Sequence, residues 1–158
     1  AVARPGDLAA REAILRAACL AGFAIDACGT AVAHAIGHAL GAIGHVHHGR
    51  AVGLALRVAL AGNARAAPEA HARIAGATGL DAADDAALAA ALPAAFDAFL
   101  RRVGLDIGLG ADGLGPADAD RLTEATLRPE NRPMLEANCR PLQSADVASL
   151  AAELLRAT

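Results

Sequence analysis

The sequence predicts an all-α protein, a helical bundle of about seven helices. Alanine and leucine, both strong helix formers, dominate the 158 residues, while aromatic residues make up only 2%. We find no run in which apolar and polar residues alternate as they do in a strand. With 55% hydrophobic and 20% charged residues, the chain has the composition of an ordered protein with a substantial core.

Capping residues and apolar stripes place the helices along the chain. Asp7 is a suitable N-cap, Pro68 suits a first helical position, and Ser144 is expected to cap the last helix. That last helix carries Val147, Leu150, Ala151 and Leu154 on one face. The other expected helices cover residues 8–28, 31–43, 49–60, 68–77, 84–103 and 116–127.

Further expectations concern burial, helix breaks and loops. The first helix is apolar all round beyond Ala17, so its second half is expected to be buried. Gly62 and Asn63 are expected to end the third helix, and Pro93 to kink or break the fifth. Residues 104–115 form a glycine-rich loop, and residues 128–141 are expected to be irregular.

Charge and composition exclude several classes of function. A net charge of −3 and the absence of Trp and Tyr argue against a nucleic-acid or anionic-membrane surface. No stretch reaches the ~18 apolar residues of a membrane span. Charged residues at Arg4, Asp7 and Arg11 interrupt any secretory signal peptide. The chain begins without Met, which suggests a trimmed or excised piece.

Three cysteines, Cys19, Cys28 and Cys139, include no C-x-x-C pair. An odd number without that spacing disfavours a disulfide framework and a cysteine zinc site. We therefore expect small buried side chains in a reducing compartment, and a cytoplasmic protein.

Residues 108–113 match the pattern G-x-G-x-x-G, which can bind a dinucleotide. That function needs a preceding strand and a helix that opens within the motif. Because a predicted helix precedes the motif and no strand is expected, we interpret it as a loop between helices.

Five of the six histidines lie between residues 34 and 48. His34 and His38 are four apart on one helix, so their side chains share a face and can share a metal ion. A zincin would need Glu after its first histidine, and Ala35 stands there. Core histidines bonded to backbone carbonyls are the alternative interpretation. His71, on a predicted surface helix, is expected to be inert.

His34, His38, Gly41, His48 and Gly49 follow the pattern H-x-x-x-H-x-x-G, a short turn, then H-G. This segment resembles the metal-binding region of the iron-containing (group III) alcohol dehydrogenases. The resemblance covers nearly the whole chain, and its supporting segments are residues 7–24, 63–75, 100–114 and 138–142. The maleylacetate reductases are related, but they usually lack the H-G pair kept at His48 and Gly49.

The resemblance implies a two-domain enzyme of which residues 1–158 are the single all-helical, metal-binding domain. The N-terminal dinucleotide-binding domain, absent from this chain, would be its partner. Such an oxidoreductase transfers a hydride between a small alcohol or aldehyde and NAD or NADP, with a divalent metal, Fe(II) or Zn(II), as Lewis acid. No nucleic-acid or membrane partner is implied, and a homo-oligomer is compatible with the family.

The resemblance also assigns roles to three residues. His34 and His48 would be metal ligands, and His38 would be a catalytic residue near the nicotinamide cofactor and the substrate. The family's two other ligands, an Asp and a His in a D-x-x-x-H arrangement, have no counterpart here. The chain alone is therefore expected to be inactive, and the three histidines are expected to lie on an exposed or concave face.

Two other functions stay open. A stand-alone helical module without dehydrogenase activity could bind metal or a protein partner, with His45 and His47 completing a local site. We favour solvated turn residues for these two histidines. Alternatively, the chain is a structural bundle in which the histidines are incidental.

Overall fold

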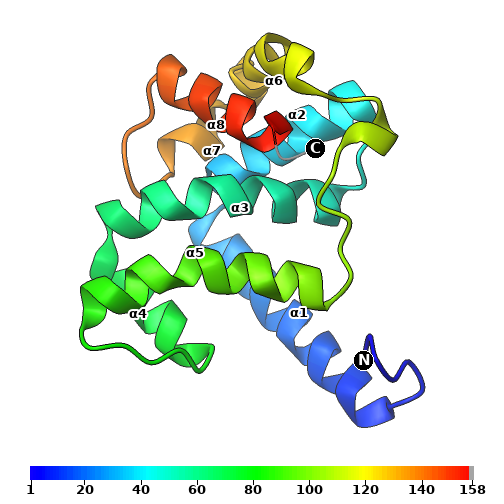
Figure 1. The fold of residues 1–158 in the computed structure, drawn as a ribbon, viewed down its shortest axis with the longest axis vertical. Helices are drawn as coiled ribbons and strands as arrows, with labels where there is room; N and C mark the ends of the chain where they lie inside the picture. Colours follow the sequence, from blue (N-terminus) through cyan, green and yellow to red (C-terminus); the bar gives the residue numbers. More distant parts are fainter. Residues whose placement is uncertain (157–158) are drawn as a thin grey trace. The chain divides into compact units, whose positions relative to one another are not determined.

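The computed structural model describes residues 1–156, and these form helices joined by loops, with no strand among them. The all-α prediction is therefore confirmed. The chain divides into two compact units, Ala1–Thr30 and Ala31–Thr158, and Figure 1 shows their helices. The α-helices are α1 (Leu8–Cys28), α2 (Val32–Gly44), α3 (His48–Ala66), α4 (Pro68–Ala77), α5 (Asp85–Arg102), α6 (Ala119–Thr126), α7 (Arg132–Glu136) and α8 (Ser144–Arg156). Three short 3-10 helices, η1 (Gly110–Asp112), η2 (Pro116–Asp118) and η3 (Pro129–Asn131), complete the described part.

The first unit consists of α1 and the short segment before it. Asp7 caps the helix as expected, because its carboxylate accepts a hydrogen bond of 3.1 Å from the Ala10 N–H. The helix ends at Gly29, whose φ of 71° suits glycine. Its N–H donates to the Ile25 carbonyl at 2.8 Å. Local capping chemistry thus defines both ends of α1.

The prediction that the second half of α1 is buried is wrong. No residue of α1 is buried, and Phe23 keeps 69% of its surface exposed. Apolar composition favours burial, but it does not supply a surface to pack against. The expectation of buried cysteines fails too: Cys19, Cys28 and Cys139 are free and exposed. Two of them lie on α1, and the third lies in the turn before α8.

The second unit has a core built around α3, which packs against α2, α5 and α8 (Figure 1). Helices α2, α3, α6 and α8 and the loop before α6 contribute the largest buried side chains: Ile36, Leu40, Leu54, Leu109, Leu122, Leu154 and Leu155. A smaller cluster of Leu60, Ala75 and Leu92 joins α3, α4 and α5. The face predicted for the last helix is confirmed, since Val147, Leu150, Ala151 and Leu154 are all buried.

Gly62 and Asn63 do not end α3 as predicted, and Pro93, predicted to kink or break α5, does not break it. Helix α3 continues past Gly62 and Asn63 to Ala66, and α5 continues through Pro93. Asn63 is held in α3 by Asn138, since their side-chain amides exchange hydrogen bonds of 2.9 and 3.1 Å. The guanidinium of Arg140 packs against Gly62 so closely that a Cβ there would lie 3.2 Å from Nε. Tertiary contacts therefore override the C-cap preference of these two residues.

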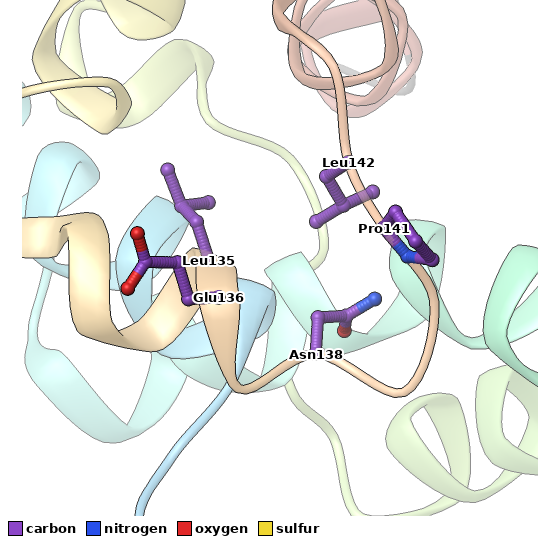
Figure 2. A pocket seen from close by; sticks show the side chains of 5 residues that line it. All are labelled: Leu135, Glu136, Asn138, Pro141 and Leu142. Atoms are coloured by element: carbon purple, nitrogen blue, oxygen red, sulfur yellow. The ribbon is translucent and has the colours of Figure 1, made fainter.

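Residues 128–141 are more ordered than the sequence suggests, because they contain η3 and α7. Asn138 is 8% exposed, and its amide also donates to the Arg140 carbonyl at 3.0 Å. Figure 2 shows this asparagine between Leu135 and Glu136 of α7 and the segment with Pro141 and Leu142. These five residues line a small pocket. One of them, Asn138, is hydrogen-bonded to Asn63 and so connects the pocket wall to α3.

Helices α3 and α5 are linked by a charged cluster. The Asp97 carboxylate accepts hydrogen bonds from Arg101 Nε at 2.9 Å and from Arg57 Nε. These bonds, that from Arg101 foremost, hold the pKa of Asp97 below its ordinary value of 3.8. The Arg57 side chain is only 17% exposed, so Asp97 offsets much of the cost of burying it.

Replacing Asp97 should therefore weaken the second unit. We expect Asp97→Asn to lower the free energy of unfolding by about 1–3 kcal/mol at neutral pH. Because the folded-state pKa is lowered, the stabilisation exists above pH 3.8 and is lost as the pH falls through the folded-state value.

Urea unfolding between pH 2 and 7 measures both effects, with Asp81→Asn, in an exposed loop, as the control. Parallel pH profiles for the Asp97→Asn variant and the unmodified chain would contradict this account.

Candidate functional site

Three imidazoles lie together where α2 passes the start of α3. The ring centroids of His34 and His48 are 5.6 Å apart, and those of His38 and His48 are also 5.6 Å apart. His34 and His38, one turn apart on α2, are separated by 6.4 Å. His38 and His48 are exposed and His34 is half-buried, so the expectation of an accessible face is met. We call these three residues the histidine trio.

The trio depends on a close approach between α2 and α3 at Gly37. A Cβ at Gly37 would lie 2.7 Å from Val52 Cγ2 and 3.2 Å from the Val52 backbone nitrogen. Only glycine lets the two helices come this near. Gly37 lies between His34 and His38, and Val52 lies one turn after His48. The same contact therefore sets the distance between the histidines of the two helices.

The turn between the helices contains the two remaining histidines of the cluster. His45 adopts a left-handed conformation with φ 53°, which histidine tolerates better than most residues. Its N–H donates to the Gly41 carbonyl at 3.1 Å and so closes α2. His47 takes the N-cap position of α3 without capping it through its side chain. Both are exposed, which supports their interpretation as solvated turn residues.

The charge state of His34 follows from its surroundings. Partial burial lowers its pKa below 6.5, and the neighbouring His48 and His38 lower it further. The neutral imidazole is therefore favoured at neutral pH. This is the form that offers a nitrogen lone pair to a metal ion or a proton to a carbonyl.

The trio is compatible with part of a metal site. A ligating imidazole nitrogen lies about 2.0–2.1 Å from zinc, so two rings on one ion have centroids roughly 5–6 Å apart. The His34–His48 distance lies in that range. Within residues 1–156, however, no group of three or more His, Cys, Asp or Glu side chains is arranged to hold an ion. The His38–His48 distance is the same, so ring spacing alone does not choose between the two pairs, and an ion held by either pair would need further donors.

A polar cluster next to the trio was not expected from the sequence. Arg50, in the first turn of α3, reaches the loop after α5. Its Nη1 donates to both carboxylate oxygens of Asp112, at 3.0 and 2.8 Å, and its Nε donates to the Asp106 carbonyl at 2.9 Å. The available signal was an arginine near the start of a largely apolar helix segment and two aspartates in a glycine-rich loop.

The two other sequence features lie outside the trio itself. Residues 108–113 form a loop with one 3-10 turn, as predicted, and the Gly108 carbonyl accepts a hydrogen bond from Arg50. His71 is half-buried on α4, and its Nδ1 lies 2.8 Å from the Ala67 carbonyl. A carbonyl can only accept, so this ring nitrogen donates and is bound to backbone.

Residues 1–155 match the family described as Fe-containing alcohol dehydrogenase family, C-terminal. The chain belongs to this family. The match covers both helical units and includes the whole histidine segment, so the resemblance carried by that segment is confirmed at the level of the family.

Curated relatives match over a shorter stretch. The probable alcohol dehydrogenases EutG of Salmonella typhimurium and of Escherichia coli are each 49% identical to this chain over 45 residues. That stretch is 28% of this chain and 11% of each relative. The match thus covers only a small part of the curated relatives' length.

Solved structures share the fold over most of the chain. A 1,3-propanediol oxidoreductase superposes with a TM-score of 0.86 at 26% identity, covering 94% of this chain and 39% of that one. The alcohol dehydrogenase from Oenococcus oeni gives a TM-score of 0.75 at 26% identity, covering 85% of this chain and 35% of that one. The NADH-dependent butanol dehydrogenase A from Thermotoga maritima, at 20% identity, shows the fold alone, with a TM-score of 0.66 over 79% of this chain and 32% of its own length.

Helix length and composition bear on membrane insertion. Within residues 1–156, no single helix is long and apolar enough to cross a bilayer. Helices α1 and α2 reach the required length and composition only when taken together, across the break between them.

The glycine contact that builds the trio can be tested by a pair of substitutions on α2. We expect Gly37→Ala to force α2 and α3 apart, at a cost of about 1–3 kcal/mol for overpacking. Gly41→Ala, one turn on, meets only the Val46 carbonyl at 3.7 Å and should be neutral or stabilising by roughly 0.5–1 kcal/mol.

Urea unfolding of both variants measures the difference in stability. Chemical shifts of the histidine rings report whether the trio moves in Gly37→Ala alone. Equal stability of the two variants would show that the Gly37 approach is not a tight contact.

Proposed function

We propose that this chain is the helical, metal-binding part of an NAD(P)-dependent alcohol dehydrogenase that interconverts an alcohol and an aldehyde or ketone. The histidine trio carries the proposal, because the sequence resemblance assigns roles to these three residues and their rings lie together in a chain of this family. In this assignment His34 and His48 are metal ligands and His38 lies near the nicotinamide and the substrate.

The properties of the three imidazoles suit these roles. The lowered pKa of His34 keeps its ring neutral and able to ligate at neutral pH. When bound, a divalent ion such as Fe(II) or Zn(II) supplies Lewis-acid polarisation of the substrate oxygen. His38 is exposed beside His48, so it can contact both substrate and solvent and can pass a proton between them.

The remaining donors and the cofactor site would come from an N-terminal dinucleotide-binding domain. The exposed apolar side chains of α1, among them Leu20, Phe23 and Ile25, support docking against another polypeptide surface. Such a domain would bring the D-x-x-x-H pair and the nicotinamide to the trio. The free thiols on the surface are compatible with a reducing, cytoplasmic location, which stays a prediction.

Metal titration of the purified chain tests the half-site. Calorimetry with Zn(II) and with anaerobic Fe(II) should show weak binding, because two imidazoles give neither tight nor selective coordination. We expect His34→Ala and His48→Ala each to abolish it. His71→Ala is the matched control and should leave binding unchanged, because His71 is bonded to backbone on another helix.

Two outcomes would count against this function. Tight one-to-one binding would mean that the chain completes its own site, for example with His45 or His47, and would favour an autonomous metal-binding module. Retained binding in His34→Ala and His48→Ala would remove these residues from the site altogether.

Catalysis requires the second domain. We expect the chain alone to show no alcohol oxidation with NAD or NADP. Fusion to a dinucleotide-binding domain that carries D-x-x-x-H should give activity, and His38→Ala should reduce it by about 10²-fold or more while metal content stays constant. Spectrophotometry at the reduced-nicotinamide absorbance, with metal analysis of each variant, separates catalysis from metal loss. An active His38→Ala fusion would contradict the role given to His38.

A further inference from the structure

We propose that Arg50 is a positioning residue for the metal ligand His48. Its guanidinium ties the first turn of α3 to the loop of residues 105–114 and so holds His48 toward His34. The inference rests on the proposed function for its catalytic meaning, but the positioning itself is a property of this chain.

All three nitrogens of the Arg50 guanidinium group donate hydrogen bonds to the loop. Nη1 makes a bidentate bond to Asp112, Nε donates to the Asp106 carbonyl, and Nη2 donates to the Gly108 carbonyl. The Arg50 and Asp112 side chains are each only 18% exposed. A planar donor group matched to a carboxylate and two carbonyls defines one position far better than a surface ion pair does.

The loop that receives Arg50 is itself anchored in the core. Leu109 is fully buried and Leu114 is 3% exposed. Leu114 packs at the end of α2, where a Cβ on Gly44 would lie 2.5 Å from its Cδ1. Asp106 also accepts a hydrogen bond of 3.0 Å from the Gly108 N–H. The loop therefore contacts both helices of the trio, α2 through Leu114 and α3 through Arg50.

The first turn of α3 needs this support. His47 does not cap the helix with its side chain, and Gly49 follows at the second helical position. An uncapped turn that contains glycine frays readily. Within residues 1–156, no hydrogen bond holds the His48 ring, and the rings of His34 and His38 lie beside it. The orientation of His48 thus depends on how firmly its backbone turn is held.

Arg50 acts through the backbone and does not touch the His48 ring. Two residues apart on a helix, the two side chains point about 160° apart around the helix axis. The histidine faces α2, and the arginine faces the loop. This arrangement defines a positioning role and distinguishes Arg50 from a ligand.

Nuclear magnetic resonance of the metal-free chain tests the positioning directly. We expect Arg50→Ala to increase exchange of the Ala51 amide, which closes the first turn of α3 by donating to the His47 carbonyl at 2.9 Å, about tenfold. It should also weaken the cross-peak between the His34 and His48 rings. Asp112→Asn should act in the same direction. Arg50→Lys should rescue only partly, because an ammonium cannot form the planar fork.

Arg57→Ala is the matched control. Arg57 is 17% exposed, lies two turns further along the same helix, and pairs with Asp97 of α5. The Arg57→Ala substitution should lower the melting temperature as much as Arg50→Ala does. It should leave unchanged both the amide exchange in the first turn of α3 and the cross-peak between the His34 and His48 rings.

Zn(II) calorimetry provides the functional readout. Arg50→Ala should weaken Zn(II) binding about tenfold, and Arg57→Ala should leave it within about twofold. An unchanged ring cross-peak in Arg50→Ala would overturn the proposal, as would equal effects of the two variants. If the unmodified chain binds no Zn(II) but the exchange and cross-peak results hold, the metal function fails while the positioning role of Arg50 stands.

Discussion

The contact between Gly37 and Val52 is the constraint on which the rest of the site depends. Two helices whose backbones approach through a glycine are held at a distance that no larger side chain permits. That separation of the helices leaves the ring centroids of His34 on α2 and His48 on α3 5.6 Å apart. The short turn of residues 45–47, with its left-handed histidine, joins these closely packed helices.

Helix α3 is the element through which polar contacts stabilise the second unit. Arg50 reaches Asp112, Arg57 reaches Asp97, and Asn63 pairs with Asn138, so three positions along one helix contact three distant segments. The partners are separated by 62, 40 and 75 residues in the sequence. Each pair is half-buried or more, which makes its geometry more specific than that of surface ion pairs.

In the proposed function, the histidine trio is one half of a metal site. Its rings are accessible, one of them has a lowered pKa, and its backbone is held by the core on one side and by Arg50 on the other. Two ligating imidazoles do not select or retain an ion well. An active centre assembled between two domains has this form, because each domain supplies only part of the coordination sphere.

Local physical chemistry in the sequence alone determined the all-α class, the Asp7 cap, the Pro68 start and the sharing of one helix face by His34 and His38. These features depend on neighbouring residues. Only the tertiary structure decided that α3 runs through Gly62 and Asn63, that α1 is exposed, and that Arg50 reaches Asp112. Such outcomes depend on which distant surface is available, and neither hydropathy nor helix propensity encodes that.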